Sequence, residues 1–384
     1  MNDKEFTSLQ DLRNRIDSVD RELVRLFVER MHTSAAVAEW KRENGKPVFD
    51  AARERALISR VSQLSGREFE EYTRVLYATI MGLSRAYQHK CLNDFSGTSG
   101  TIRDMLDRTP QIFPERAAVA CQGVEGAYSQ IAAERLFKAP EISFYTSFSD
   151  VFDAISSGTC RYGVLPIENS TAGSVTQVYD LMEKHSFHIV GARRLRIDHH
   201  LLRKPGATGP IRRIVSHEQA LRQCSEFLSA HPEYEAVAMA NTAVAAQFAA
   251  DSERDDVAVI AAKTCAELYN LEVVGESVSN VQSNYTRFIC ISRRLEIYRG
   301  ARKISIMCNL PHEAGSLNSV ISRLAIAGIN LCKLESRPIP GRDFEFRFFF
   351  DLEADPRDPE VVQLLCELER KSEHFVFLGA YEER

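Results

Sequence analysis

The distribution of proline restricts the fold of this chain more than any other feature. Of its 13 prolines, only Pro47 lies before Pro110. Proline interrupts a helix because it has no backbone N–H and clashes with the preceding turn. The front of the chain, residues 1–90, is therefore predicted to be all-helical, and the rest is free to contain other structure.

The apolar residues at the front predict one long helix. They recur at alternating spacings of three and four, as in a helical seam, at Leu9, Leu12, Ile16, Val19, Leu23 and Leu26. Thr7 or Ser8 can cap its start, and Asn44-Gly45 with Pro47 can end it. Such a helix of about 36 residues would be roughly 54 Å long and could not bury its seam alone, so we expect a partner chain. Two further helices are expected, from Asp50 to near Gly66 and from Phe69 to Tyr87.

Turn residues and short apolar runs predict the rest of the architecture. Residues 91–114 carry Gly, Ser and Pro and are expected to be a linker with one helical turn at 102–108. From 117 to about 295, apolar runs alternate with helical patterns, which predicts βαβ units, a mainly parallel sheet and two lobes around a cleft. The tail has the strand and helix order βαββαβ, which is ferredoxin-like. The predicted domains are 1–92, 93–115 (linker), 116–296 and 302–384.

Composition excludes several classes of protein. The chain has a formal net charge of −5, with 44% hydrophobic and 26% charged residues, as is typical of a soluble globular protein. It has no basic stripe for nucleic acid and no apolar run that could span a membrane. The charged start, Met1–Glu5, does not resemble a signal peptide. The nine cysteines form no CxxC pair, so we expect no metal site, no disulfide framework and a cytoplasmic location.

A set of polar residues occupies positions on the predicted helices where apolar residues would be expected. Arg30 and Lys41 are eleven residues apart, which is about 20° around a helix and roughly 16 Å along it, so the two could grip one small dianion. Arg13 is seventeen residues from Arg30, about 25 Å along the same helix, so it could act only in the site of a partner chain. The full set is Arg13, Arg30, Lys41, Asp50, Arg53, Glu54, Ser84 and Gln88.

In residue type and order, this set resembles the site of the all-helical chorismate mutases, over residues 8–90. The resemblance implies that Arg13, Arg30 and Arg53 hold carboxylates, that Lys41 and Gln88 face the ether oxygen, that Glu54 and the backbone of Asp50 orient the ring hydroxyl, and that Ser84 supports the site. The rearrangement is unimolecular. It requires a clamped substrate and donors where negative charge develops, and no acid, base or nucleophile.

In the middle of the chain, four polar turns each follow a predicted strand. The strand ends of α/β sheets face ligand crevices, although each turn taken singly could be a helix cap. They place Ser129, then Glu168, Asn169, Ser170 and Thr171, then His217 and Gln219, then Thr242. A fifth segment, Asn284-Tyr285-Thr286-Arg287-Phe288, begins the last strand.

These motifs, over residues 117–292, resemble those of prephenate dehydratases. The resemblance implies that Thr286 is the catalytic group, a positioned hydrogen-bond donor beside the departing hydroxyl. It also implies that Arg287 binds a substrate carboxylate, or else pairs internally. The other substrate-binding residues it implies are the eight named in the four turns, with Asn284 and Phe288.

The tail carries two further motifs. Gly315-Ser316-Leu317 lies at a strand-to-helix turn, where free backbone amides suit a carboxylate, and Glu335-Ser336-Arg337-Pro338 ends the next strand. Both resemble the L-phenylalanine-binding motifs of ACT domains. The alternative is a structural domain that only dimerises.

Together, these features are similar to the bifunctional chorismate mutase/prephenate dehydratases. That family implies a multidomain protein with an all-α mutase domain, an α/β bilobal dehydratase domain like periplasmic binding proteins, and an α+β ferredoxin-like ACT domain. It implies two steps, chorismate to prephenate and prephenate to phenylpyruvate, with no cofactor, feedback inhibition by L-phenylalanine, and a homodimer or dimer of dimers. The alternatives are an arogenate-accepting dehydratase or a non-catalytic amino-acid sensor. A mutase paired with a dehydrogenase would need a GxGxxG motif, which the sequence lacks.

Overall fold

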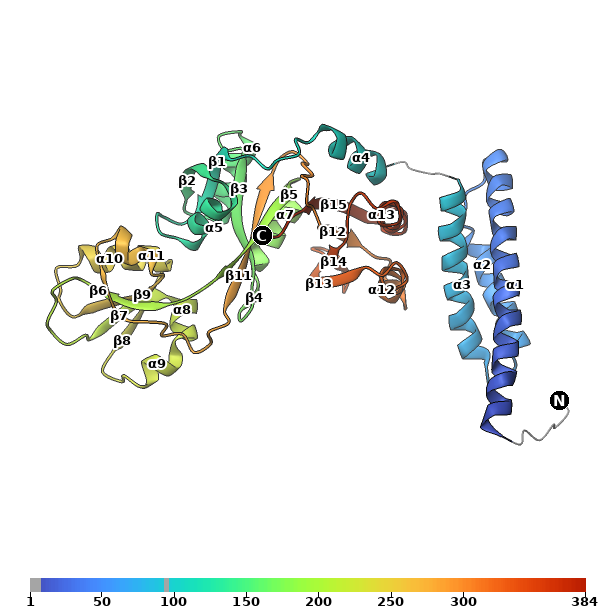
Figure 1. The fold of residues 1–384 in the computed structure, drawn as a ribbon, viewed down its shortest axis with the longest axis horizontal. Helices are drawn as coiled ribbons and strands as arrows, with labels where there is room; N and C mark the ends of the chain where they lie inside the picture. The colour runs from blue at the N-terminus through green and yellow to red at the C-terminus, as the bar shows by residue number, and fades with distance from the viewer. Residues whose placement is uncertain (1–7, 93–96) are drawn as a thin grey trace. The chain divides into compact units, whose positions relative to one another are not determined.

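The computed structural model describes residues 8–92 and 97–384 (Figure 1). The chain divides into two compact units, Met1–Ser96 and Gly97–Arg384. Within the described residues, no helix has both the length and the apolar character needed to cross a membrane.

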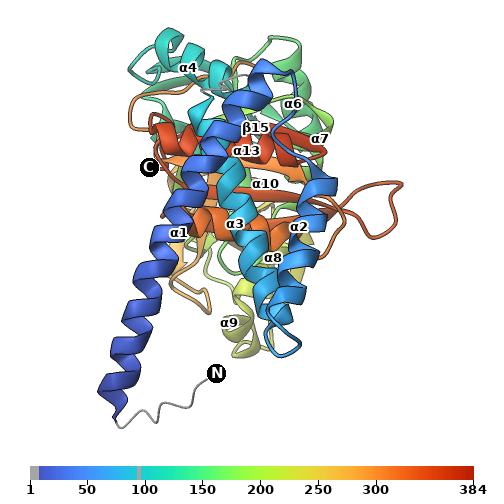
Figure 2. The ribbon, with the colours of Figure 1, turned by 90° about the vertical axis from the view of Figure 1, so that its right-hand side faces the viewer.

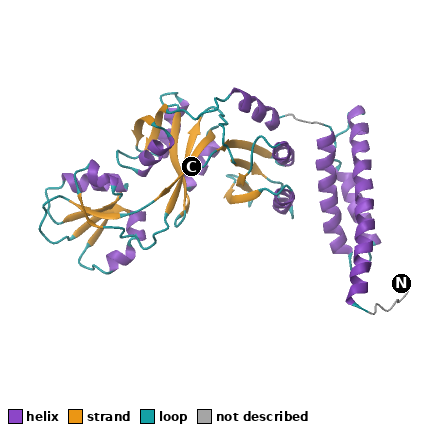
Figure 3. Ribbon diagram, viewed as in Figure 1, coloured by secondary structure: helices purple, strands orange, loops and turns teal. Residues whose placement is uncertain are grey.

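The described part of the first unit consists of helices and loops, as the proline distribution predicts (Figure 3). Its helices are α1 (Leu9–Glu43), α2 (Ala51–Leu64) and α3 (Glu70–Cys91). Ser8 caps α1 by accepting the backbone N–H of Asp11, and Asp50 caps α2 by accepting that of Arg53. Helix α3 packs against both α1 and α2 (Figure 2). The predicted long helix is confirmed, and Thr7 lies outside the described residues.

The first lobe of the second unit is a six-stranded sheet in the order β2-β1-β3-β11-β5, with β4 paired to β3. Strand β1 is parallel to β2 and β3, whereas β11 is antiparallel to β3 and β5. The strands are β1 (Arg116–Gln122), β2 (Ala139–Tyr145), β3 (Tyr162–Asn169), β4 (Gly173–Ser174), β5 (His188–Arg196) and β11 (Tyr285–Ser292). The helices are α5 (Tyr128–Leu136), α6 (Phe148–Ser156) and α7 (Thr176–Lys184).

The second lobe is a five-stranded sheet in the order β10-β6-β9-β7-β8. Its strands are β6 (His200–Arg203), β7 (Arg213–His217), β8 (Glu235–Met239), β9 (Val257–Ala261) and β10 (Glu272–Gly275). Its helices are α8 (Glu218–Gln223), α9 (Ser225–Ser229), α10 (Thr242–Asp251) and α11 (Thr264–Leu268). The chain passes between the lobes twice, after β5 and before β11 (Figure 1). The two expected lobes are present, but the expectation of mainly parallel pairing is wrong: each lobe has a mixed sheet, because each crossover brings in an antiparallel strand.

The tail has the predicted order of elements and a four-stranded antiparallel sheet in the order β13-β14-β12-β15. One face of this sheet packs under α12 and α13 around Ile304 and Phe350. The other face places Met307, Phe349 and Leu378 in the core of the first lobe, so the tail and that lobe share a core. The elements are β12 (Lys303–Asn309), α12 (Ser316–Ile326), β13 (Asn330–Pro338), β14 (Phe346–Glu353), α13 (Pro359–Lys371) and β15 (His374–Tyr381).

The expected linker contains more structure than the sequence suggested. Helix α4 (Thr98–Arg108) is eleven residues long and packs on α13. Ile102 is buried in the core of the tail, and the backbone N–H of Thr98 donates to Glu369 Oε2 at 3.0 Å. The helix is stable there because the tail buries its apolar side.

Candidate functional sites

A cavity of about 460 Å³ lies among α1, α2 and α3. Its lining includes seven of the eight polar residues that the sequence singled out in the helical unit: Arg30, Lys41, Asp50, Arg53, Glu54, Ser84 and Gln88. Helical periodicity explains this convergence, because residues several turns apart on one helix return to the same face.

The cavity suits an anion. All three of its carboxylates are already engaged: Glu29 pairs with Arg25 at 3.1 Å, Asp50 caps α2, and Glu54 pairs with Arg85. Its three cations, Arg30, Lys41 and Arg53, therefore face the cavity with little opposing charge. The sequence analysis did not identify Arg85, a residue of α3 that forms an ion pair with Glu54. Arg85 belongs to no motif.

Two buried polar atoms of residues that line this cavity, Arg30 Nη1 and Gln88 Oε1, have no hydrogen-bond partner among the described residues. Gln88 Nε2 donates to Ser84 Oγ at 3.3 Å, and Ser84 in turn donates to Ser34 at 2.7 Å. Lys41 Nζ donates to the carbonyl of Val48 at 2.6 Å. Because an unpaired buried polar group costs free energy, the arrangement favours a polar ligand that satisfies both atoms.

Arg13 does not line this cavity. It is exposed near the start of α1, about 25 Å along the continuous helix from Arg30. The structure of one chain therefore leaves the site without it, as the helical spacing predicts.

A second cavity, of about 450 Å³, lies between the two lobes of the second unit. The first lobe contributes Ser129, Asn169, Thr286 and Phe288, and the second contributes His217, Gln219 and Thr242. These seven predicted residues come from strand ends, turns and β11, far apart in the sequence, and the two crossovers bring them together.

The hydroxyl of Thr286 is held as a donor. Thr286 is 8% exposed and pairs with Asn169 across β11 and β3. Asn169 Nδ2 donates to Thr286 Oγ1 at 2.9 Å, while Asn169 Oδ1 accepts the backbone N–H groups of Thr171 and Ala172 at 3.0 and 2.9 Å. Those N–H groups fix the orientation of the amide. Because Thr286 Oγ1 already accepts a hydrogen bond, its own proton is available to a ligand in the cavity.

His199 and Gln223 line the same cavity, and sequence reasoning missed both. Gln223 Nε2 donates to Thr171 Oγ1 at 2.9 Å, which leaves Gln223 Oε1 facing His199 Nε2 at 3.0 Å. Burial lowers the pKa of His199, so the ring is neutral near pH 7 and carries its proton on Nε2. His199 Nδ1 is then a buried acceptor without a partner among the described residues.

Five residues predicted to bind substrate do not line this cavity: Glu168, Ser170, Thr171, Asn284 and Arg287. Three of them support it. Thr171 Oγ1 donates to Asn169 Oδ1 at 2.7 Å, Asn284 Oδ1 accepts from Asn169 at 2.7 Å, and Ser170 Oγ accepts the N–H of Tyr285 at 2.9 Å.

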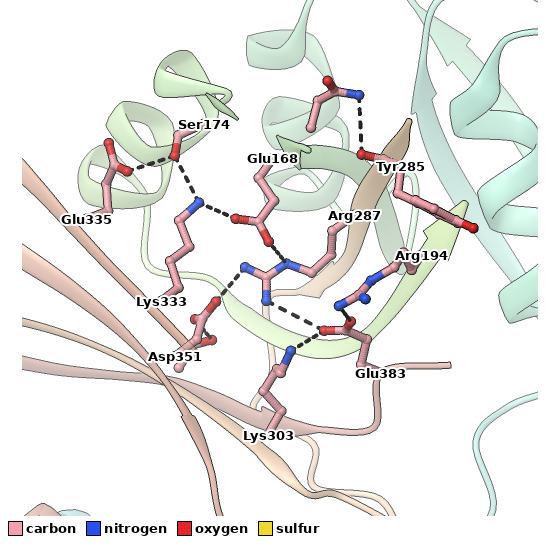
Figure 4. Close-up of polar contacts among 12 residues, drawn as sticks. Glu168, Ser174, Arg194, Tyr285, Arg287, Lys303, Lys333, Glu335, Asp351 and Glu383 are labelled. Atoms are coloured by element: carbon pink, nitrogen blue, oxygen red, sulfur yellow. Dashed lines mark hydrogen bonds and ion pairs between the residues drawn. The ribbon is translucent and has the colours of Figure 1, made fainter. Parts of the chain in front are cut away.

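The expectation that Arg287 binds a substrate carboxylate is not supported, and its internal pairing is what the structure shows (Figure 4). Arg287 is 5% exposed, and its Nε lies 2.9 Å from Glu168 Oε1. Its terminal nitrogens face Asp351 and, at 3.7 Å, Glu383. Side chains alternate along a strand, so the placement of Thr286 toward the cavity turns Arg287 toward the tail.

A third cavity, of about 320 Å³, lies in the tail at the start of α12. Ser316 and Leu317 line it with His312, Glu313 and Phe346, and Gly315 caps α12 with φ at +89°. The second predicted motif, Glu335 to Pro338, does not line it. Instead, Glu335 accepts from Ser174 at 2.7 Å and Arg337 pairs with Asp180 at 2.9 Å, so one chain does not bring the two motifs together. Among the described residues, no cluster of His, Cys, Asp and Glu is placed to hold a metal ion.

Comparison with known proteins assigns each unit a family. The model of chorismate mutase type II matches residues 12–89, and that of prephenate dehydratase matches residues 119–296. A bifunctional chorismate mutase/prephenate dehydratase of Neisseria gonorrhoeae (strain ATCC 700825 / FA 1090) is 32% identical over 372 residues, which cover 96% of this chain and 95% of that protein.

Two solved structures are similar to part of this chain. A prephenate dehydratase from Arthrobacter aurescens in complex with L-Phe is 27% identical, with a TM-score of 0.62, over 69% of this chain and 90% of that chain. GqqA, described as a novel type of quorum quenching acylase, is 30% identical, with a TM-score of 0.64, over 70% of this chain and 98% of that chain.

Proposed function

Because the chain belongs to the family of bifunctional chorismate mutase/prephenate dehydratases, we propose that its helical unit rearranges chorismate to prephenate and that its bilobal cavity converts prephenate to phenylpyruvate. Both steps belong to phenylalanine biosynthesis. One observation carries the proposal: in each unit, the polar residues that the chemistry needs converge on a single cavity.

In the mutase step, the helical cavity acts by holding its substrate. Arg30 and Arg53 bind carboxylates, and the unpaired Nη1 of Arg30 supplies a free donor. Lys41 stabilises the negative charge that develops on the ether oxygen as the C–O bond breaks, and so does Gln88, through the N–H of Nε2 that it does not give to Ser84. The carboxylates engaged by Arg25 and Arg85 do not compete with the substrate.

In the dehydratase step, prephenate loses its ring hydroxyl and its ring carboxylate, and the ring becomes aromatic. The electrons of the breaking C–C bond form the ring π-system as CO₂ leaves, and the hydroxyl departs as hydroxide, which takes up a proton from solvent to become water. Thr286 donates a hydrogen bond to that hydroxyl, and Asn169 holds Thr286 in place.

The mutase unit is proposed to act as a homodimer with composite sites. The seam of α1 is exposed in a single chain, with Leu9 at 63%, Ile16 at 58% and Leu23 at 55%. A groove of about 930 Å³, lined by Val19, Leu23 and Leu26 of α1 and by residues of α3, runs beside it. A second copy of α1 in that groove would bury the seam. It would also carry Arg13 to the partner's cavity.

The proposed domains are a mutase domain at 1–92, a linker at 93–115, a dehydratase domain at 116–296 and an ACT regulatory domain at 302–384. The ferredoxin-like order of the tail sheet supports the last assignment. The packing of α4 on α13 places part of the linker against that domain.

A coupled assay tests the function. Full-length protein supplied with chorismate and no cofactor should form prephenate and then phenylpyruvate, and supplied prephenate should give phenylpyruvate directly. Arogenate should be measured in parallel, since faster turnover of arogenate would favour the arogenate-accepting alternative. Failure to consume either chorismate or prephenate would contradict the proposal.

L-Phenylalanine should bind the tail and lower dehydratase turnover. Backbone N–H groups at the start of α12 suit its carboxylate, and Leu317 and Phe346 supply apolar walls. The variant Ser316→Glu places a like charge where that carboxylate would bind, and it suits a helix start. Calorimetry should detect binding to the wild-type protein and at least about tenfold weaker binding to this variant.

The matched control is Asn318→Glu, an exposed position on the same helix outside the cavity. It should bind L-phenylalanine as the wild type does. Deleting the tail is a poor test, because its sheet completes the core of the first lobe. Equal binding by both variants would show that the ligand does not use this turn.

A further inference from the structure

Two neighbouring cross-strand pairs at the start of β11 face in opposite directions. In the register with β3, Thr286 lies opposite Asn169, and Arg287 lies opposite Glu168. The first pair faces the cavity, where Asn169 donates to Thr286 at 2.9 Å. The second faces the tail, where Arg287 and Glu168 approach to 2.9 Å as an ion pair. Because the same two backbone segments carry both pairs, a displacement of one pair moves the other.

The tail holds both members of the second pair (Figure 4). Asp351 of β14 binds Arg287, and Lys333 of β13 donates to Glu168 Oε2 at 2.5 Å. Lys333 also donates, at 2.9 Å, to Ser174 Oγ, and Ser174 lines the cavity. The tail therefore contacts the backs of the two strands that carry Asn169 and Thr286.

This network is mostly buried and joins charges of opposite sign. Three carboxylates, Glu168, Asp351 and Glu383, face four cations, Arg287, Lys333, Lys303 and Arg194. Burial acts to lower the pKa of Arg287, but Asp351 and Glu168 outweigh it, so the net shift is upward. Arg287 is 5% exposed, so withdrawing Asp351 or Glu168 would leave its buried guanidinium without one of its counter-charges. The network therefore favours one arrangement of the tail against the two strands.

We propose that Glu168 and Arg287 are a positioning pair through which the tail sets the placement of Asn169 and Thr286. The proposal rests on the dehydratase function proposed above. When Asp351 and Lys333 hold the pair, β3 and β11 present the Thr286 hydroxyl to the substrate. When the tail withdraws them, the pair relaxes and the hydroxyl shifts. A ligand that favours one arrangement of the tail would then change the rate of the chemical step rather than the affinity for substrate.

The chain offers a matched control for this idea. Arg337 of β13 pairs with Asp180 of α7 at 2.9 Å. That contact also joins the tail to the first lobe, and Asp180 touches neither β3 nor β11 in any ion pair or hydrogen bond among the described residues. A variant of Asp180 therefore removes a contact between the tail and the first lobe without disturbing Glu168 or Arg287. Its effect can be compared with the loss of Asp351 or Lys333.

The experiment compares three full-length variants, Asp351→Asn, Lys333→Gln and Asp180→Asn, with supplied prephenate as the substrate. Urea unfolding of each gives the folded fraction, so that kcat is expressed per folded enzyme. Asp351→Asn should lower kcat on the order of tenfold, as expected for a displaced catalytic group, with KM within about twofold of the wild type. Lys333→Gln should act in the same direction, and it leaves Glu168 still paired with Arg287, so folding is retained. Asp180→Asn should keep the wild-type kcat.

The outcomes separate the two proposals. If the wild type does not convert prephenate, the dehydratase function itself fails. If the wild type is active and Asp351→Asn and Lys333→Gln have the same kcat as Asp180→Asn, the proposal that Glu168 and Arg287 position the catalytic group is wrong. A rise in KM at unchanged kcat in Asp351→Asn and Lys333→Gln would also overturn it, because it would indicate that the pair serves substrate binding.

Discussion

Removal of the Thr286 hydroxyl should lower the dehydratase kcat at least about a hundredfold and leave the mutase rate unchanged. Thr286→Val is the sharpest variant, because valine keeps the shape of threonine and favours a strand. The proton of this hydroxyl is available to a ligand in the cavity, since its oxygen already accepts from Asn169. Without it, the departing hydroxyl of prephenate loses its positioned donor.

Two controls accompany this prediction. Thr286→Ser keeps the hydroxyl and should retain much of the activity, whereas Thr286→Ala should resemble Thr286→Val. In the reciprocal experiment, Lys41→Ala should lower the mutase rate on the order of a hundredfold and spare the conversion of supplied prephenate. A Thr286→Val protein with wild-type kcat would exclude the hydroxyl from the chemical step.

Local patterns predicted the three helices of the first unit and the order of the tail elements correctly. The seam and caps of α1 depend on residues within a few turns of one another, and the observed helix, Leu9–Glu43, follows them. The tail elements also carry their own turn residues and caps, such as Asp358 and Pro359 at the start of α13. Information of this kind is local, so a single sequence contains it.

Strand β5 shows where local patterns fail. It carries Arg193, Arg194 and Arg196, and these charges interrupt the apolar pattern by which a strand is predicted. The strand nevertheless pairs with β11. Arg194 pairs with Glu383 at 2.7 Å, and the backbone N–H of Arg194 donates to the carbonyl of Arg384 at 3.1 Å. The groups that satisfy this strand come from the far end of the chain, so no window of sequence around it could reveal them.

The residues of the candidate sites also divide into those that the sequence revealed and those that only the fold revealed. Residues that face a cavity because of their position in a motif, such as Thr286 and Asn169, were found from the sequence. Arg287 shares the motif but faces the tail, and its partner Asp351 is 64 positions away. His199 and Gln223 belong to no motif, and the fold brings Gln223 to Thr171 and His199 to Gln223. The sequence shows which residue types are present, but only the fold shows which way their side chains face.

The mutase site should require two chains, and mixing two inactive variants should reveal this. Arg13→Ala and Lys41→Ala are each expected to be inactive. In a hybrid dimer, the cavity of the Arg13→Ala chain keeps Lys41 and receives Arg13 from its partner. The other cavity lacks both residues. Random exchange makes half of the dimers hybrids with one intact site each, so roughly a quarter of the wild-type mutase activity should return.

The structure supplies the control that makes this result specific. Arg30 and Lys41 line the same cavity within one chain. A mixture of Arg30→Ala with Lys41→Ala therefore has one defect in each cavity of every hybrid and should stay inactive. Exchange is verified by mass spectrometry of differently tagged chains before either mixture is assayed. If the Arg13→Ala mixture is as inactive as the Arg30→Ala mixture after exchange, Arg13 does not serve a partner's site. The exposed seam of α1 would then need another explanation than a shared mutase dimer.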